Sequence, residues 1–254
     1  MKPIAGTSVL VTGGGSGIGE AAARRFVAAG ARVTISGRRA ERIEAVAADI
    51  GEACRAVQGD VAEDANRRAM VEAAVAHGGG RLDVLVSNAG NMYRGPLEQL
   101  EEAKVLDLFR VNVVAGMMLA ALCLPHLAKT KGAIVFIGSV HTQRAYPGAS
   151  PYAATKGAIE TLTGVLAAEL GQQGVRVNCV RPGAVFTELN VRAGLSDAAG
   201  ARKRLDNMAA AHALMRIGTA DEIAEAIEYL SRAEWTTGAV LAVDGGLGLG
   251  VTFM

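Results

Sequence analysis

Hydrophobic and polar residues alternate along this chain in two kinds of segment. Short apolar runs rich in β-branched residues are each followed by a longer, alanine-rich stretch with helical spacing. Continuous apolar strands separated by helices are typical of a parallel sheet covered on both faces. The runs predicted to be strands are Ser8–Thr12, Arg32–Ser36, Arg55–Gly59, Leu82–Ser87, Ala133–Ser139, Val175–Arg181 and Ala239–Val243.

The segments between the strands predict the helices and, with them, the fold. Right-handed crossovers between consecutive parallel strands give an α/β fold with a doubly wound, seven-stranded parallel sheet and helices on both faces. We expect one domain over residues 1–254, with ligands at the carboxyl ends of the strands. Helices are predicted to begin near Gly17, Ala40, Asp64, Leu100, Asn112, Pro151 and Ala220.

One segment departs from this alternation. Residues 187–219 contain no strand pattern, only two short helical patterns with Arg, Lys and His. A long insertion after the carboxyl end of a strand is where a substrate lid would lie. A plain surface hairpin of two helices is the alternative, and the pattern does not separate the two.

Composition and charge exclude several classes of protein. Half of the residues are hydrophobic, a fifth are charged and the net charge is +1, so neither disorder nor nucleic-acid binding is indicated. The three cysteines, Cys54, Cys123 and Cys179, lie far apart without ligand spacing, which predicts no metal site and a reducing compartment such as the cytoplasm. The apolar run Val111–Leu127 is short for a membrane span and is interpreted as a buried helix.

A glycine cluster joins the first predicted strand to the first predicted helix. Glycine permits a tight turn there and lets the backbone approach a diphosphate, while the helix N-terminus offers free amide groups to the phosphates. Between a strand and a helix of an alternating fold, this cluster predicts a Rossmann-type dinucleotide site. The residues concerned are Thr12, Gly13, Gly15, Ser16, Gly17, Ile18 and Gly19.

The end of the second predicted strand bears on the choice of cofactor. An acidic residue there would accept a hydrogen bond from the ribose 2′-hydroxyl of NAD, but this chain has Arg38 and Arg39. A guanidinium binds a 2′-phosphate, so we expect a preference for NADP(H), with NAD(H) possible. Two solvated arginines opening a helix are the alternative. After the third strand, Asp60-Val61 is placed to contact the adenine, or Asp60 serves as a helix N-cap.

Three residues downstream suggest alcohol–carbonyl chemistry. Ser139 closes a predicted strand, and Tyr152 and Lys156 are four residues apart, on one face of a predicted helix. A tyrosine with a pKa of about 10 is a weak base near neutrality. A lysine ammonium about 4 Å away is expected to lower that pKa by about 3 units at an effective dielectric constant near 20. Ser139 would hold the substrate oxygen near the phenol.

Together these motifs resemble the short-chain dehydrogenase/reductase family, in its compact single-domain branch, over essentially the whole chain. Thr12-Gly13-x-x-x-Gly17-x-Gly19 matches the cofactor motif of the family, and Ser139 with Tyr152-x-x-x-Lys156 matches its catalytic set. Other matches are Asn88-Ala89-Gly90 beside the cofactor, Asn112 of the proton relay, and Pro182, Gly183, Val185 and Thr187 in the loop that contacts the nicotinamide.

The resemblance implies a mechanism and an assembly. Tyr152 would be the general acid/base, Lys156 would bind the nicotinamide ribose and lower the tyrosine pKa, Ser139 would orient the substrate, and Asn112 would extend a proton relay. Hydride transfer would need no metal. The family also implies a homotetramer, with the apolar helices starting near Asn112 and Pro151 forming much of one interface.

Loop position alone supplies candidates for the wall of the substrate site. His141 follows Ser139 by two residues and is interpreted as a polar wall rather than a second acid/base. Arg202-Lys203-Arg204 is either an attractor for an anionic substrate or a solvated helix face. The other candidates are Met92, Tyr93, Arg94, Gln143, Arg144, Phe186 and Leu189.

The leading hypothesis is an NADPH-dependent carbonyl reductase or the matching alcohol dehydrogenase acting on a small molecule. A 3-oxoacyl thioester reductase is a candidate within that class, although Ala149 stands where such enzymes often have glutamine. A sensor or scaffold that binds a dinucleotide without catalysis is the alternative from another class. The presence of all four catalytic positions argues against the sensor.

Overall fold

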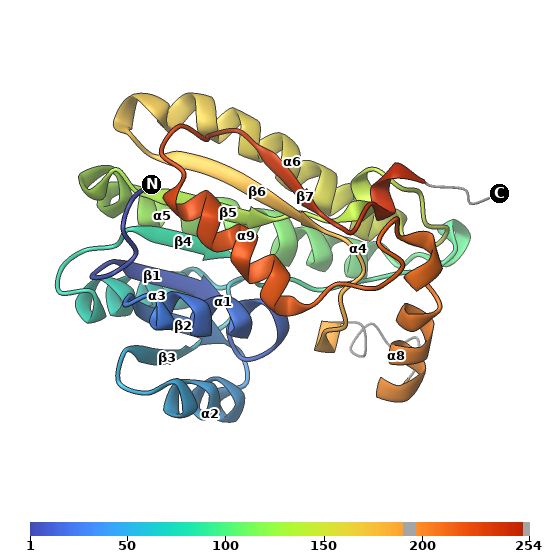
Figure 1. Ribbon diagram of the computed structural model, residues 1–254, viewed down its shortest axis with the longest axis horizontal. Coiled ribbons are helices and arrows are strands. Elements are labelled where there is room, and N and C mark those ends of the chain that lie inside the picture. Colours follow the sequence, from blue (N-terminus) through green and yellow to red (C-terminus); the bar gives the residue numbers. More distant parts are fainter. Residues whose placement is uncertain (190–196, 251–254) are drawn as a thin grey trace.

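Seven parallel strands form one sheet in the computed structural model, which describes residues 1–189 and 197–250 (Figure 1). The strand order β3-β2-β1-β4-β5-β6-β7 is that of a doubly wound sheet, as the alternation predicted. The order reverses between β1 and β4, and the carboxyl ends of those two strands therefore flank the crevice where ligands bind in such folds. The strands are β1 (Ser8–Thr12), β2 (Arg32–Gly37), β3 (Cys54–Gln58), β4 (Val84–Ser87), β5 (Ala133–Ile137), β6 (Arg176–Pro182) and β7 (Val240–Val243).

Helices cover both faces of the sheet. Helices α1 (Gly17–Ala28), α2 (Ala40–Ile50) and α9 (Ala220–Arg232) pack on one face, and α1 and α9 lie side by side there. Helices α3 (Asp64–His77), α5 (Ala115–Thr130) and α6 (Ser150–Leu170) pack on the other. Two apolar clusters follow from this arrangement, one on each side of the strands.

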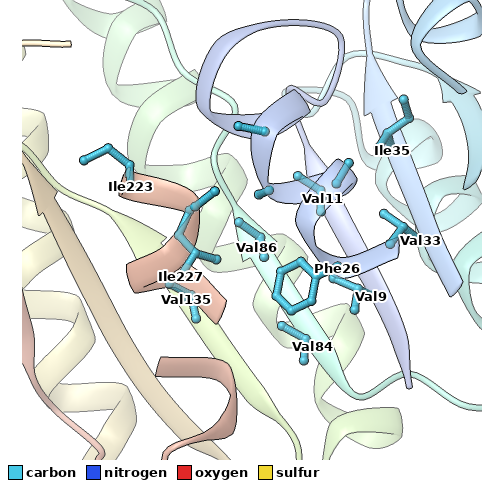
Figure 2. Packing of buried hydrophobic residues seen from close by; sticks show 14 of the residues in the cluster. Val9, Val11, Phe26, Val33, Ile35, Val84, Val86, Val135, Ile223 and Ile227 are labelled. Carbon is cyan, nitrogen blue, oxygen red and sulfur yellow. The ribbon is translucent and has the colours of Figure 1, made fainter. Parts of the chain in front are cut away.

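The face covered by α1 and α9 shows why the strands are apolar throughout. Phe26 of α1 is fully buried and lies against Val9, Val33 and Val84, from three neighbouring strands, as Figure 2 shows. Every residue of β1 is buried, because helices cover the strand on both sides. Burying a phenylalanine contributes about 1.5–3 kcal/mol, so this contact fixes α1 against the strand that precedes it.

One predicted break between two helices was wrong. We expected separate helices near Leu100 and Asn112, but α4 (Glu102–Phe109) continues through a π-helical turn (Arg110–Val114) directly into α5. A π-turn inserts one residue into the helix, which periodicity does not reveal. By length and hydropathy alone the run Glu102–Thr130 would suffice to cross a membrane, a test that core helices also pass, and less than half of its most apolar part is buried.

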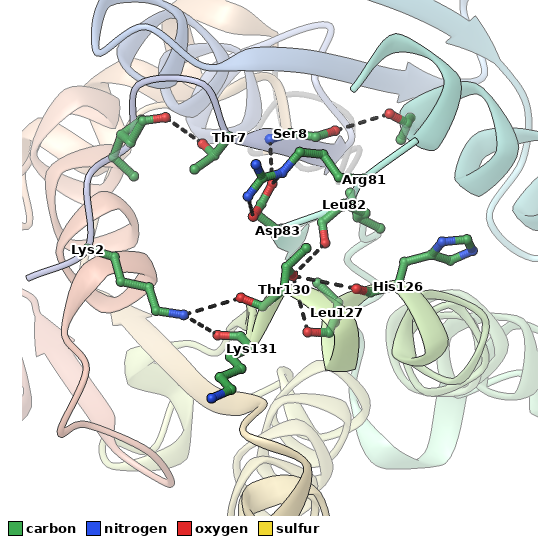
Figure 3. A network of polar contacts seen from close by, with 12 residues as sticks. Lys2, Thr7, Ser8, Arg81, Leu82, Asp83, His126, Leu127, Thr130 and Lys131 are labelled. Carbon is green, nitrogen blue, oxygen red and sulfur yellow. Dashed lines mark hydrogen bonds and ion pairs between the residues drawn. The ribbon is translucent and has the colours of Figure 1, made fainter. Parts of the chain in front are cut away.

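Polar contacts connect neighbouring segments at the end of the sheet opposite the crevice, where the strands begin (Figure 3). The Asp83 carboxylate accepts from the Ser8 amide at 2.9 Å and from two guanidinium nitrogens of Arg81. Thr130 donates to the Leu82 carbonyl at 2.9 Å, and Lys2 donates to the Lys131 carbonyl at 2.5 Å. These contacts join the starts of β1 and β4 to the end of α5, so the strands that carry the site have a fixed register.

The segment predicted as a substrate lid is described only in part. Residues 190–196 lie outside the described residues. Helix α8 (Ala198–Asp206) follows, begins at an Asp197 N-cap that accepts from the Gly200 amide, and brings Leu205 against a small apolar cluster with Val140 and Leu247. The described part of residues 187–219 is therefore packed beside the carboxyl ends of the strands.

Candidate active site

A cavity of about 490 Å³ opens at the carboxyl ends of the strands and contains most of the predicted site residues. The glycine loop and the N-terminal turn of α1 form one wall. The predicted residues that line the cavity are Gly13, Gly15, Ser16, Gly17, Ile18, Arg38, Arg39, Asp60, Val61, Asn88, Ala89, Gly90, Ser139, His141, Tyr152, Lys156, Pro182, Gly183, Val185, Thr187 and Leu189.

The glycine loop is held in place by residues beneath it. Thr12 Oγ1 accepts from the backbone amides of Asn88 and Ala89 at 3.0 and 2.9 Å, which joins the ends of β1 and β4. The Asn88 side chain donates to the Thr12 carbonyl at 2.8 Å. A Cβ on Gly19 would lie 2.3 Å from the carbonyl oxygen of Gly13, so the loop and α1 approach each other as only glycine allows. Thr12 and Gly19 thus shape the loop from behind and do not line the cavity.

The end of the cavity beside β2 carries opposed charges. Arg39 and Arg42 both pair with the Glu188 carboxylate, and Arg38 lies 3.8 Å from an Asp60 carboxylate oxygen. The sequence interpretation included Arg38, Arg39 and Asp60 but missed Arg42 and Glu188. Arg42 follows Arg38 and Arg39 by about one helical turn, so its spacing in the sequence could have placed it on the same face. No sequence signal brought Glu188 to this end, because its position depends on the tertiary fold.

The predicted catalytic residues converge at the centre of the cavity. Tyr152 and Lys156 share one buried face of α6, and Ser139 follows β5. Lys156 Nζ donates to the Ile137 carbonyl at 2.8 Å and lies 5.6 Å from the centre of the Tyr152 ring. The lysine is therefore held between the end of β5 and the tyrosine.

Burial dominates the pKa values of this centre. It raises the pKa of Tyr152 to about 12, against a lowering effect of the hydrogen bond with Ser139. It also lowers the pKa of Lys156 to about 8. The expected fall in the tyrosine pKa is not found, because both groups lose water and the lysine stands over the ring instead of directly at the hydroxyl. The phenol is held in its protonated form.

Asn112 lies behind the catalytic helix and is buried. Asn112 lies in the π-turn, and its side-chain Oδ1 accepts a hydrogen bond from the backbone amide of Asn91 at 2.8 Å. Asn112 Nδ2 in turn donates to the Asn91 carbonyl at 2.9 Å and to Thr155 Oγ1 at 3.1 Å. Asn112 therefore does not line the cavity and connects the loop after β4 to α6.

Beyond Tyr152 the wall of the cavity contains both polar and apolar side chains. The His141 ring lies edge-on to the Tyr152 ring, with centroids 5.2 Å apart, and its Nδ1 is 2.9 Å from Ser139 Oγ. Burial lowers the pKa of His141 to about 4, so the imidazole is neutral near pH 7. Met92, Arg94, Leu189 and Arg204 are candidates that also line the cavity. The lining residues Tyr146, Leu205, Met208 and Leu247 were not foreseen and form one apolar cluster with Val140.

Four residues proposed for the substrate wall lie outside the cavity lining. The Arg144 guanidinium donates to the Leu247 carbonyl at 3.0 Å. The Tyr93 hydroxyl accepts from the Glu101 amide at 3.0 Å. Phe186 packs in the small apolar cluster and lies under the Arg202 guanidinium. A Cβ on Gly248 would lie 2.7 Å from Gln143 Oε1, which places the Gln143 side chain against the C-terminal segment. Position in a loop did not reveal which way these side chains point.

Comparison with known proteins identifies the family. The model of the short chain dehydrogenase family matches residues 7–197, well over half of the chain. The chain belongs to the short-chain dehydrogenase/reductase family. Members are oxidoreductases that act on CH–OH or C=O groups with NAD(P), and this chain is such an enzyme.

Relatives and solved structures of this family differ in their stated substrates. An L-fucose dehydrogenase of Bos taurus is 36% identical over 97% of this chain and 91% of its own length. A 3-ketoacyl-(acyl-carrier-protein) reductase of Brucella melitensis, solved with NADH, is 32% identical over 96% of this chain and 99% of its own, with a TM-score of 0.89. A short chain dehydrogenase of Burkholderia cenocepacia, solved with NADP, is 34% identical over 97% and 99%, with a TM-score of 0.87.

Proposed function

We propose that this enzyme reduces a ketone or other carbonyl compound with NADPH, or oxidises the matching secondary alcohol. The observation that carries the proposal is the meeting of Ser139, Tyr152 and Lys156 in one cavity whose other wall is the glycine loop. The glycine loop and the loop after β6, which both line the cavity, would hold a dinucleotide with its nicotinamide end toward the tyrosine.

The chain's own residues supply the proton chemistry, and the nicotinamide ring, when bound, supplies or accepts the hydride. Tyr152 gives its phenolic proton to the oxygen of the substrate as the carbonyl becomes an alcohol. Ser139 Oγ donates a hydrogen bond to that same oxygen and so orients it. Lys156 Nζ, held by the Ile137 carbonyl, is the group placed to bind the nicotinamide ribose.

The protonation state of the tyrosine fits its role as the proton donor in the reduction. Burial raises the pKa of Tyr152 to about 12, so the phenol is the stable form at neutral pH. Reduction needs a proton donor at this position, whereas oxidation needs the phenolate. Asn112, which matches the proton-relay position of the family and is held by contacts with Asn91 and Thr155, is proposed to extend the path along which Tyr152 regains its proton.

Three arginines support a preference for NADPH over NADH. Arg38, Arg39 and Arg42 line the end of the cavity beside β2, and guanidinium groups bind phosphate through paired hydrogen bonds. The Brucella and Burkholderia structures hold NADH and NADP respectively, so the family as a whole does not decide the matter. The Glu188 carboxylate already binds two of these arginines and would compete with a 2′-phosphate.

Removing that competition is expected to favour NADPH. In Glu188→Gln, the dissociation constant for NADPH should fall by up to about fivefold relative to that for NADH, the range of an exposed ion pair. Fluorescence titration with both cofactors measures the ratio. Glu63→Gln, which removes the exposed partner of Arg110 away from the cavity, is the matched control. An unchanged or lower NADPH preference in Glu188→Gln would show that Glu188 does not compete with the phosphate.

Assembly, lid and compartment complete the proposal. A homotetramer is supported by apolar side chains left exposed along α4, the π-turn and α5, namely Leu106, Val114, Met117 and Met118, and by Val165 on α6. The described part of residues 187–219 is proposed to cover the substrate, because Arg204, Leu205 and Met208 already line the cavity. Three free, buried cysteines suit a reducing compartment such as the cytoplasm.

The first experiment is a substrate panel. NADPH and NADH oxidation are followed spectrophotometrically with ketones, aldehydes, diketones, sugar-derived ketones and 3-oxoacyl thioesters. We expect turnover of at least one class, with NADPH giving the higher kcat/KM. Turnover with NADH alone would contradict the proposed cofactor preference. Tight binding of both cofactors without turnover of any class would contradict a reductase and favour a dinucleotide sensor.

A further inference from the structure

The end of the cavity beyond the catalytic tyrosine carries two arginines. Arg94 comes from the loop after β4 and Arg204 from α8, and both line the cavity. Their place follows from their neighbours. The Tyr146 ring lies beside His141, which lies edge-on to Tyr152. Arg94 donates to the carbonyl of Pro147, the residue after Tyr146, and Arg204 precedes Leu205, which packs in one cluster with Tyr146. The two guanidinium groups therefore lie on the substrate side of Tyr152, away from the arginines beside β2.

Neither guanidinium has an acidic partner within the described residues. Arg94 donates a hydrogen bond to the Pro147 carbonyl at 3.3 Å and is repelled by Arg204. Arg202, which lies on the same helix as Arg204, pairs with Asp206. The carboxylates that line the cavity, Asp60 and Glu188, belong to its other end and are already paired there. Residues 190–196, outside the described part, contain no aspartate or glutamate.

Two like charges facing one cavity are unfavourable unless an anion comes between them. Burial, and then the charge of Arg204, lower the pKa of Arg94. Arginine stays protonated in proteins, so the repulsion persists and is relieved only by a negative group. A guanidinium pair of this kind is well suited to a carboxylate or a phosphate.

The remaining walls indicate what joins that anion to the carbonyl. Leu205, Met208 and Leu247 give this end an apolar surface, so an aliphatic or aromatic segment fits between the two polar ends. The Tyr146 hydroxyl is buried at this wall without a hydrogen-bond partner among the described residues, which is a costly arrangement. A ligand oxygen reaching this wall would relieve that cost.

We propose that the substrate is a carbonyl compound with an anionic group, a carboxylate or a phosphate, which Arg94 and Arg204 bind while Ser139 and Tyr152 hold the carbonyl oxygen. The inference rests on the proposed reductase function and specifies its substrate class. Binding energy from the anionic end would position the carbonyl for hydride and proton transfer.

Matched substrates test the inference. Oxo acids of five to nine carbons are compared with their methyl esters, and the best length is then made as the corresponding phosphate, to separate carboxylate from phosphate preference. We expect wild type to favour an anionic form over the ester by about tenfold or more in kcat/KM, mainly through KM. In Arg94→Gln and in Arg204→Gln, the ratio of kcat/KM for the anionic substrate to kcat/KM for the ester should fall by about tenfold. Arg94→Lys should restore part of it.

Arg202→Gln is the control for a general loss of positive charge. Arg202 lies on the same helix as Arg204, is exposed and already pairs with Asp206. In Arg202→Gln, the ratio of kcat/KM for the oxo acid to kcat/KM for its methyl ester should stay at the wild-type value. A wild type that turns over esters as well as acids, or a ratio that Arg94→Gln and Arg204→Gln leave within twofold of wild type, would overturn the inference while leaving the reductase function intact.

A binding measurement keeps the test independent of turnover. Calorimetric titration of the NADPH-bound enzyme with octanoate or octyl phosphate should show binding that weakens about tenfold or more in the double variant Arg94→Gln/Arg204→Gln. Equal binding by wild type and double variant, or binding of neither octanoate nor octyl phosphate by wild type, would refute the anion site. Absence of turnover with every carbonyl, acid or neutral, would instead contradict the proposed function.

Discussion

Tyr152→Phe is expected to lower kcat for carbonyl reduction by a factor of about 10²–10⁴, the usual contribution of a general acid. The substitution removes the phenolic proton and leaves the ring, which is buried against His141 and Lys156. The fold and the cofactor wall should therefore persist. The measurement is steady-state NADPH oxidation with the best substrate of the panel, beside fluorescence titration of NADPH binding.

The matched control is Tyr229→Phe, which removes the same hydroxyl from an exposed tyrosine on α9. This variant should keep wild-type kcat and KM. If Tyr152→Phe kept more than a tenth of wild-type kcat while binding NADPH normally, the proton would have to come from another group. His141 would then be the first to test, because its Nδ1 is 2.9 Å from Ser139 Oγ.

Gly19→Ala is expected to lower NADPH affinity by about a hundredfold and to destabilise the fold by about 1–3 kcal/mol, the range of an overpacked core. The new Cβ would lie 2.3 Å from the Gly13 carbonyl oxygen and 2.6 Å from Asn88 Nδ2. Those two groups also hold the glycine loop against the end of β4, so the loop must move away from its place. Thermal unfolding and NADPH titration measure the two effects.

Gly171→Ala provides the comparison, since a Cβ there meets nothing within 4 Å and the backbone has ordinary helical angles. Its melting temperature should equal or slightly exceed that of wild type, as alanine restricts the unfolded chain. Wild-type NADPH affinity in Gly19→Ala would mean that α1 yields without moving the loop, and the loop's backbone would then not set the diphosphate site.

Much of the fold was predictable because it depends on local pattern. Apolar runs at strand spacing and the glycine cluster placed β1, α1 and the crevice correctly, since both signals arise from near neighbours in sequence. The π-turn at Arg110–Val114 was not predictable in this way. It adds one residue to a helix without changing composition, and it is stabilised by Asn112 contacts with residues distant in sequence.

Charge and side-chain direction in the site were harder to foresee. The pairing of Glu188 with Arg39 and Arg42 joins positions about 146–149 residues apart. The pKa of Tyr152 depends on how completely α6 and its surroundings exclude water, which motif spacing does not report. Tyr93, Gln143 and Phe186 share loops with residues that do line the cavity, yet their side chains turn to other partners. Sequence motifs therefore predicted where the catalytic residues lie, whereas their pKa values and charge pairs depend on tertiary packing.

The Asn112 contacts join the residues around the catalytic helix but do not reach the residues proposed to bind the anionic end of the substrate. One amide side chain joins the π-turn, the start of the loop after β4 and the catalytic helix, so these three parts move together. Arg94 lies three residues farther along that loop, and Arg204 comes from a helix outside this connection. Arg94 and Arg204, which we propose to bind the anionic end of the substrate, therefore lie outside the part of the molecule that Asn112 joins. We expect changes in the loop beyond Asn91 or in α8 to alter which carbonyl is accepted and to leave the packing of Tyr152 on the catalytic helix unchanged.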